Sequence, residues 1–219
     1  MQFRNAALLG LLLAGGCSAA YAVAPPHGDA DAGSQKAFAC AACHGFDGNS
    51  SSPQFPSLAG QDAEYIAEQL QAFKDGQRAN QIMLGMAAAL SPQDMRDIAA
   101  HFASQKPALA TTGPAPSGVG AKLFHDGNPG QGVPACATCH GVDGRGIRGT
   151  APRLAGQQPE YLSNVLGAWR SGITWGKSAR AQIMPQIAKN LTAADVSALV
   201  DYLAQMPATA TAPMDKPGK

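Results

Sequence analysis

The sequence predicts an all-α protein built from two tandem copies of one helical module. Residues 40–65 align without a gap to residues 136–161, and the shared marks include Cys-x-x-Cys-His-Gly, Asp-Gly, Leu-Ala-Gly-Gln and Glu-Tyr. Repetition over a segment of this length indicates a duplicated structural unit. Apolar residues in both copies recur at helical spacing, and the Gly-, Ser- and Pro-rich segment after each cysteine motif contains no convincing strand.

Each copy is expected to contain a middle helix and a final helix. The middle helices have apolar residues at i, i+4 and i+7, namely Ile66, Leu70 and Phe73 in the first copy and Leu162, Leu166 and Trp169 in the second. The final helices follow capping residues, which are Ser91 with Pro92 and Thr192. Their expected buried faces are Met95, Ile98 and Phe102, and Val196, Leu199 and Leu203. Upstream of the cysteines, GSQKAFAC corresponds loosely to GAKLFHDGNPGQGVPAC, where the second copy has an extra loop.

The N-terminus has the order of a secretory signal peptide. Arg4 precedes an apolar run over residues 6–14, and Ala-x-Ala cleavage sites follow near residue 24. The run is short for a membrane span, so we expect residues 1–24 to be removed after export to a bacterial periplasm. An uncleaved anchor and lipidation at Cys17 are the alternatives.

The rest of the chain divides by composition. We expect the first domain over residues 25–107, a Pro-, Ala- and Thr-rich linker over 108–117, the second domain over 118–206 and a disordered tail over 207–219.

Four cysteines remain after export, in two close pairs that are each followed directly by a histidine. The residues are Cys40, Cys43 and His44, and Cys136, Cys139 and His140. C-x-x-C-H is the attachment motif of c-type haem, in which two thiols form thioethers with the porphyrin and the adjoining histidine binds the iron. The sequence therefore predicts two covalently bound haem c groups, which would also staple modules too small to have a large core.

Two other uses of paired cysteines are less consistent with this pattern. Pooling both pairs could give a four-thiolate zinc site, but the repeated histidines and methionines would then have no role. A redox-active dithiol of the thioredoxin type needs a βαβ context, which the sequence lacks.

Methionine sulfur is the expected second axial ligand, as in cytochromes c. Met83 and Met184 alone repeat in register, inside the shared Gln-Ile-Met triplet, 39 and 44 residues after their histidines. The larger spacing indicates a five-residue insertion within SGITWGKSAR of the second copy. Met86 has no repeated counterpart and ranks second in the first domain. Core or tail positions are expected for Met95, Met206 and Met214.

Pro56 and Pro152 also repeat, before the Leu-Ala-Gly-Gln motifs. A metal-bound histidine usually donates its second N–H to a carbonyl or carboxylate, so the carbonyls of these prolines are candidate acceptors; simple turn prolines are the alternative. His27, His101 and His125 do not repeat and are expected in the N-terminal tail, on a helix surface and in a loop, with His125 a candidate for tuning the second haem.

Taken together, these motifs resemble the dihaem cytochrome c4 family, whose members consist of two class I cytochrome c domains. The resemblance rests on CAACHGFDGNS, FPSLAGQ and QIMLGMAAALSPQDMRDIAAHFASQ in the first half, and on GVPACATCHGVDG, PRLAGQ and QIMPQIAKNLTAADV in the second. It implies His/Met ligation by His44 with Met83 and by His140 with Met184. It also implies electron transport from the respiratory chain to haem–copper terminal oxidases, notably of the cbb3 type.

The expected function is therefore that of a soluble electron carrier rather than an enzyme. Its partners would be redox proteins: a terminal oxidase and an upstream cytochrome complex or dehydrogenase. No integral membrane segment is expected after processing, although peripheral association remains compatible with the sequence. A dihaem enzyme resembling a thiosulfate dehydrogenase or peroxidase is the alternative, and it would need an open iron site. A dedicated electron-accepting subunit of such an enzyme is a third possibility. Scattered arginines without interleaved aromatics do not indicate nucleic acid binding.

The two halves carry opposite charge. Residues 25–112 contain five Lys/Arg and nine Asp/Glu, a net charge of −4, whereas residues 113–219 contain ten and six, a net charge of +4. This asymmetry either orients the protein toward its partners, with the basic half facing an acidic docking surface, or attracts the two domains to one another.

Overall fold

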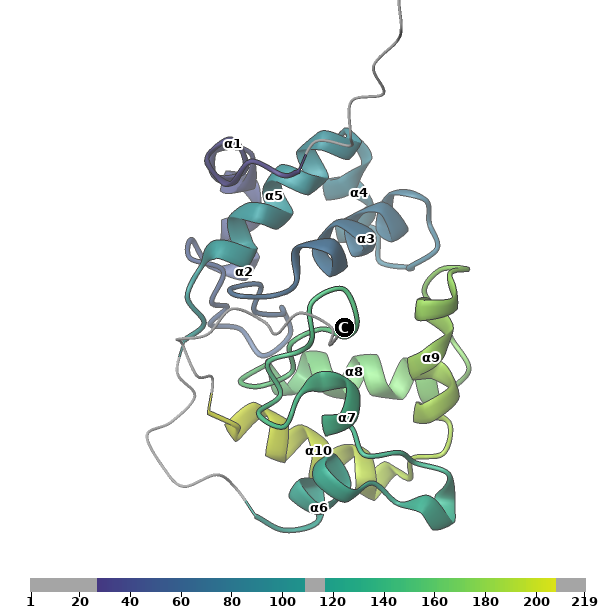
Figure 1. Cartoon of the computed structure of the whole chain (residues 1–219). Coiled ribbons are helices and arrows are strands. Elements are labelled where there is room, and N and C mark those ends of the chain that lie inside the picture. Colours follow the sequence, from purple (N-terminus) through teal and green to yellow (C-terminus); the bar gives the residue numbers. More distant parts are fainter. Residues whose placement is uncertain (1–26, 109–116, 208–219) are drawn as a thin grey trace, which may run out of the picture.

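A computed structural model describes residues 27–108 and 117–207 and folds them into two helical domains, one above the other (Figure 1). The predicted signal peptide with Cys17, nearly all of the linker, and the tail with Met214 lie outside the described residues. The described residues form helices and two isolated bridges, Asn128 with Val133 and Ile147 with Ala151, but no strand. The all-α prediction is confirmed. None of the described helices is long and apolar enough to cross a membrane.

The helices occur in the same order in both domains. The first domain contains α1 (Ala30–Lys36), the 3-10 helix η1 (Ala37–Cys40), α2 (Ala41–His44), α3 (Ala63–Lys74), α4 (Gln81–Ala88) and α5 (Pro92–Ser104). The second domain contains α6 (Val119–Asp126), the 3-10 helix η2 (Pro129–Gln131), α7 (Ala137–His140), α8 (Pro159–Arg170), α9 (Ala179–Ala188) and α10 (Ala193–Gln205).

The caps predicted for the final helices are present. Ser91 forms a capping box with Asp94 at the start of α5, and Thr192 forms the equivalent box with Asp195 at the start of α10. Each box satisfies backbone N–H groups that the first helical turn would otherwise leave without acceptors. The local sequence therefore fixes where both final helices begin.

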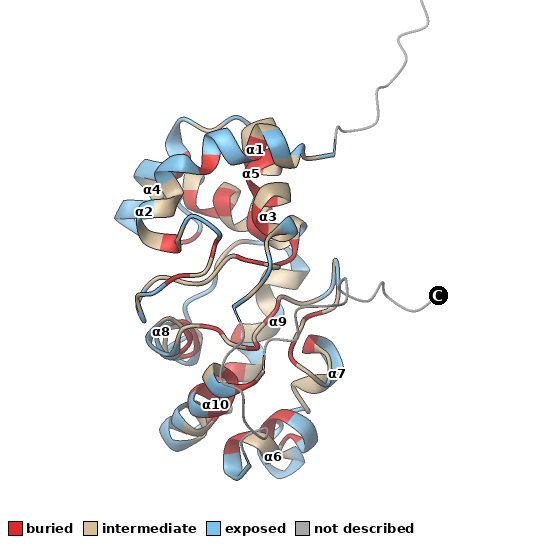
Figure 2. Ribbon diagram, turned by 90° about the vertical axis from the view of Figure 1, so that its left-hand side faces the viewer, coloured by how far each residue is buried: buried red, intermediate tan, exposed pale blue. Residues whose placement is uncertain are grey.

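Each domain has its own apolar core, seen as the buried faces between the helices in Figure 2. The predicted buried face of α5 is nearly inaccessible to solvent, as is that of α10. The middle helices α3 and α8 pack against these faces through Ile66 and Leu70, and through Leu162 and Leu166. Met95 and Met206 are buried core residues, as predicted.

The helices upstream of the cysteines, α1 and α6, are short and were not predicted. Both cross a final helix at a glycine. A Cβ atom on Gly33 would lie 1.9 Å from the Asp97 carbonyl oxygen of α5, and one on Gly120 would lie 2.0 Å from the Ala198 carbonyl oxygen of α10.

The loop position predicted for His125 is wrong. The residue lies in α6, and its Nε2 atom is 2.8 Å from the Tyr202 hydroxyl.

Candidate functional site

Both cysteine motifs face one continuous cavity of about 800 Å³ that extends across the domain interface. Residues from both copies of the repeat line it, including Cys40, Cys43, His44, Pro56 and Met83, and Cys136, Cys139, His140, Pro152 and Met184. The two halves of the duplicated sequence thus bring all of the predicted site residues to the wall of a single space.

The two motif histidines are held in the same way. His44 and His140 end the short helices α2 and α7, where Gly45 and Gly141 adopt positive φ angles of 82° and 79° and stop the helix. Both side chains are buried, and burial lowers the pKa of each imidazole, opposed by a hydrogen bond to a backbone carbonyl.

Those carbonyls belong to the repeated prolines. Nδ1 of His44 lies 2.8 Å from the carbonyl oxygen of Pro56, and Nδ1 of His140 lies 2.8 Å from that of Pro152. Because a carbonyl oxygen only accepts hydrogen bonds, Nδ1 carries the hydrogen in each neutral ring. The lone pair is then on Nε2, which is the tautomer that binds a metal through Nε2.

The four cysteines are free thiols rather than disulfides. Within residues 27–108 and 117–207, no three His, Cys, Asp or Glu side chains are grouped closely enough to hold a metal ion. The pooled four-thiolate zinc site therefore has no geometric support. The pairs instead face the cavity separately, one from each domain.

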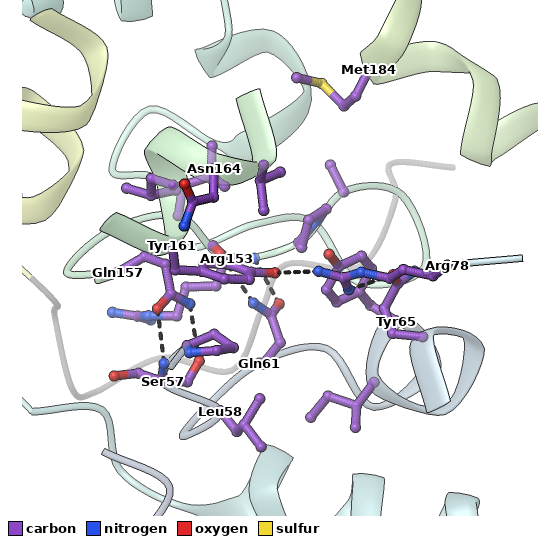
Figure 3. Close-up of a pocket in the computed structure, with 18 of the residues that line it drawn as sticks. Ser57, Leu58, Gln61, Tyr65, Arg78, Arg153, Gln157, Tyr161, Asn164 and Met184 are labelled. Carbon is purple, nitrogen blue, oxygen red and sulfur yellow. Dashed lines mark hydrogen bonds between the residues drawn. The ribbon is translucent and has the colours of Figure 1, made fainter. Parts of the chain in front are cut away.

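Three methionines line the cavity, and their packing differs. Met83 on α4 and Met184 on α9 are half-buried and pack against the cores of their domains. Met86 also lines the cavity but is 39% exposed. Figure 3 shows Met184 on α9, at the second-domain side of the cavity.

The cavity wall also carries polar groups that lack partners. Trp169 Nε1 and Arg153 Nη2 are buried and have no hydrogen-bond acceptor among the described residues. A buried donor without an acceptor is costly, so a ligand with acceptor groups is expected there. Haem has an apolar ring, which suits the apolar part of the wall, and two carboxylate side chains, which could accept hydrogen bonds from these donors. The residues present therefore fit this cofactor.

A symmetric pair of glutamines joins the domains at the cavity. The amide of Gln61 bonds to the backbone N–H and carbonyl of Arg153, and the amide of Gln157 bonds to those of Ser57. Figure 3 shows both pairs side by side. These glutamines end the Leu-Ala-Gly-Gln repeats, so the sequence signal for them was the repeat itself, although no role was assigned to them.

A buried arginine also joins the domains, and this contact is not symmetric. Arg78 of the first domain bonds to Gln69 Oε1 at 2.7 Å and to the Tyr161 hydroxyl at 3.2 Å. Its guanidinium carbon lies 3.8 Å from the ring centre of Trp175 and 4.6 Å from that of Phe73. Trp175 lies in the segment SGITWGKSAR, which contains the five-residue insertion of the second copy. No repeated motif marks Arg78, and sequence reasoning missed it.

Opposite charges also meet across the interface. Arg180 of α9 lies 3.4 Å from a carboxylate oxygen of Glu68 and 3.9 Å from one of Glu64 on α3. Part of the charge asymmetry between the halves is therefore used between the domains themselves. Such partly exposed pairs contribute little stability individually, about 0–1 kcal/mol.

Comparison with known proteins agrees with this geometry. The family model for cytochrome c matches residues 30–106 and 119–207. Cytochrome c4 of Pseudomonas aeruginosa is 41% identical over 200 residues, which cover 91% of this chain and 98% of the relative. A thiosulfate dehydrogenase electron acceptor of Stutzerimonas stutzeri is 40% identical over 174 residues, covering 78% and 80%.

A solved structure resembles the whole fold as well. Reduced recombinant cytochrome c4 from Pseudomonas stutzeri superimposes with a TM-score of 0.76 at 40% identity, covering 82% of this chain and 99% of that one. The similarity spans both domains and both cysteine motifs. The chain therefore belongs to the dihaem cytochrome c4 family, and it is an electron-transfer cytochrome with two covalently bound haem c groups.

Proposed function

We propose that the protein is a periplasmic electron carrier rather than an enzyme, which passes single electrons from an upstream cytochrome complex or dehydrogenase toward a haem–copper terminal oxidase. One observation carries this proposal: the same constellation of two thiols, a histidine, a proline carbonyl and a methionine occurs twice around one cavity. When bound, each haem supplies a reversible one-electron change at its iron. Two equivalent sites in one cavity suit electron exchange within the molecule.

Each constellation divides its tasks among the chain's own residues. When haem is bound, the thiols of Cys40 and Cys43, and of Cys136 and Cys139, would attach the two porphyrins. His44 and His140 would bind the irons through Nε2, oriented by the carbonyls of Pro56 and Pro152. Met83 and Met184 would supply the methionine sulfur ligands. Their packing against the domain cores, compared with the greater exposure of Met86, supports this choice.

A thioether ligand favours electron transfer over catalysis. A neutral sulfur donor raises the reduction potential, and a filled coordination sphere leaves no position for a substrate. The second candidate is a dedicated electron acceptor of thiosulfate dehydrogenase, favoured by two relatives with that name at 40% and 33% identity. It requires the same site chemistry and differs only in the partner.

The proposal also covers the location of the protein and the limits of its domains. The N-terminal sequence supports cleavage of residues 1–24 and export to the periplasm. We propose limits of 25–107 and 118–206 for the two domains, and the regions 30–106 and 119–207 that the cytochrome c model matches support this division. Residues 108–117 would connect the domains.

Ligand exclusion tests the axial assignment. In the reduced wild-type protein, we expect two low-spin haems that do not bind carbon monoxide, and in the oxidised protein the near-infrared sulfur-to-iron band. Met184→Ala should open one iron per molecule to carbon monoxide, and Met83→Ala should open the other, whereas Met86→Ala should open neither. Unchanged exclusion in Met184→Ala would show that another residue binds the second iron. A high-spin wild-type component at neutral pH would favour the enzyme instead.

A second experiment separates the two partners. Stopped-flow oxidation of the reduced protein by a haem–copper oxidase, compared with reduction of the oxidised protein by a thiosulfate dehydrogenase, measures which exchange is fast. The oxidase reaction should be fast and should slow with added salt if the basic half of the chain guides docking. Fast exchange with the dehydrogenase alone would identify the protein as that enzyme's acceptor.

A further inference from the structure

Gln61 reaches from the first domain to the loop that orients the histidine of the second. Its Nε2 donates to the carbonyl oxygen of Arg153 at 3.0 Å, and its Oε1 accepts from the backbone N–H of Arg153 at 2.8 Å. Arg153 directly follows Pro152, whose carbonyl oxygen lies 2.8 Å from Nδ1 of His140. The glutamine is 5% exposed, so water does not compete for these bonds.

Gln157 makes the reciprocal contact. Its Oε1 accepts from the backbone N–H of Ser57 at 2.8 Å, and its Nε2 donates to the carbonyl oxygen of Ser57 at 3.0 Å. Ser57 directly follows Pro56, whose carbonyl oxygen lies 2.8 Å from Nδ1 of His44. Figure 3 shows this pair beside the Gln61 pair.

The decisive feature is that one peptide group carries both contacts. The carbonyl of Pro152 and the N–H of Arg153 belong to the same planar unit, and so do the carbonyl of Pro56 and the N–H of Ser57. A peptide group is rigid about its C–N bond. Fixing its N–H therefore fixes the direction of its carbonyl oxygen, and with it the orientation of the imidazole that donates to that oxygen.

Each glutamine is in turn anchored in its own domain. Gln61 Oε1 also accepts from the N–H of Asp62 at 2.9 Å, and Gln157 Oε1 accepts from that of Gln158 at 2.8 Å. These are the residues that precede α3 and α8. A hydrogen bond to the N–H of a peptide also polarises the carbonyl of that peptide and strengthens it as an acceptor.

We propose that Gln61 and Gln157 are positioning residues that act across the domain interface, each holding the proline peptide that orients the iron-binding histidine of the opposite domain. The inference rests on the proposed role of His44 and His140 as iron ligands. A stronger acceptor makes the histidine a more basic ligand, which favours the oxidised iron. The docked interface thus lowers the potential of both sites, and each domain tunes the iron of the other.

The test is a cross-effect in full-length, haem-loaded protein. Gln61→Ala should speed solvent exchange of the Nδ1 hydrogen of His140 and leave that of His44 nearly unchanged, as seen by NMR of reduced protein with ¹⁵N-labelled histidine. Gln157→Ala should do the reverse. An NMR-monitored redox titration of each variant should show a higher reduction potential for the iron of the opposite domain. The expected change is about threefold in the equilibrium constant for reduction, which equals about 30 mV for one electron.

Two further variants keep the result interpretable. Gln61→Met fills a similar volume but cannot make the hydrogen bonds. If Gln61→Ala does not fold, the same measurement can be made on Gln61→Met. Gln158→Ala removes another bond between the domains, from Gln158 Nε2 to the carbonyl oxygen of Ser50, without touching a proline peptide. It should leave both Nδ1 hydrogens unchanged.

Other outcomes would overturn the inference. Equal changes at both histidines in Gln61→Ala, or a change confined to His44, would show that the glutamines only brace the interface. Failure of the proposed ligand set looks different: the ring hydrogens of His44 and His140 would then lack the large ring-current shifts of haem-bound imidazoles in the wild-type protein itself.

Discussion

Replacing Gly120 with alanine tests how closely α6 packs on α10. A Cβ atom at this position would lie 2.0 Å from the Ala198 carbonyl oxygen and 2.7 Å from the Tyr202 Cβ atom. Ordinary contact begins at 3.4 Å, so the new methyl group is about 1.4 Å too close to the backbone of α10. Since no side-chain rotation can relieve a clash with backbone, the two helices must separate.

The cost follows from that separation. A gap of 0.5–1 Å already loses about a quarter to a half of each contact's dispersion energy, and this interface includes the fully buried Phe124. Overpacked cores typically lose about 1–3 kcal/mol. We expect the second domain to lose about 2–3 kcal/mol, which lowers the melting temperature of a domain of this size by roughly 10–20 °C.

Gly167→Ala is the matched control in the same domain. Gly167 lies within α8, and a Cβ atom there would meet no atom within 4 Å. Alanine should therefore stabilise the helix by up to about 1 kcal/mol. Thermal and urea unfolding of the haem-loaded variants, followed by far-UV circular dichroism, gives both values. Equal stability of Gly120→Ala and Gly167→Ala would refute the reasoning that glycine is needed for this crossing.

Two other predictions concern the helix cap and acid stability. Thr192→Ala should destabilise the second domain by about 1 kcal/mol through loss of the cap of α10, and restored stability in Thr192→Ser but not in Thr192→Val would identify the hydroxyl as the cause. The pKa of the Asp97 carboxyl is lowered mainly by a hydrogen bond from the backbone N–H of Asp29, and next by the ammonium of Lys36. Lys36 also pairs with Asp94. A lowered native pKa contributes stability above the unfolded pKa of about 4. This stability should be lost as the pH falls from there through the native pKa, and an equally steep acid loss in Asp97→Asn, measured by urea unfolding, would contradict this origin.

Sequence patterns with a local cause predicted the structure well. The capping boxes at Ser91 and Thr192, the buried faces of the final helices and the middle helices all depend on residues within one or two turns of each other. The repeated cysteine motifs and methionines were equally readable, because duplication shows each twice. The repeated cysteines, histidines and methionines all line the cavity.

The remaining features depend on contacts between distant segments. Gly33 and Gly120 matter because of backbone atoms 64 and 78 residues away, in α5 and α10. The helices that carry them are only seven and eight residues long, and their neighbours in sequence do not indicate these contacts. The roles of Gln61, Gln157 and Arg78 arise only when the two domains meet. No property of one copy alone predicts how it docks on the other.

Because of the contact between Arg78 and Trp175, the two copies cannot exchange places without loss of an interdomain contact. A buried guanidinium in the first copy is covered by the ring of Trp175, which lies in the segment of the second copy that contains the insertion. A chain assembled from two first copies would leave that cation partly uncovered, and one assembled from two second copies would have a tryptophan with no cation to cover. The two copies share one fold, but this contact gives each of them a different part in the interface.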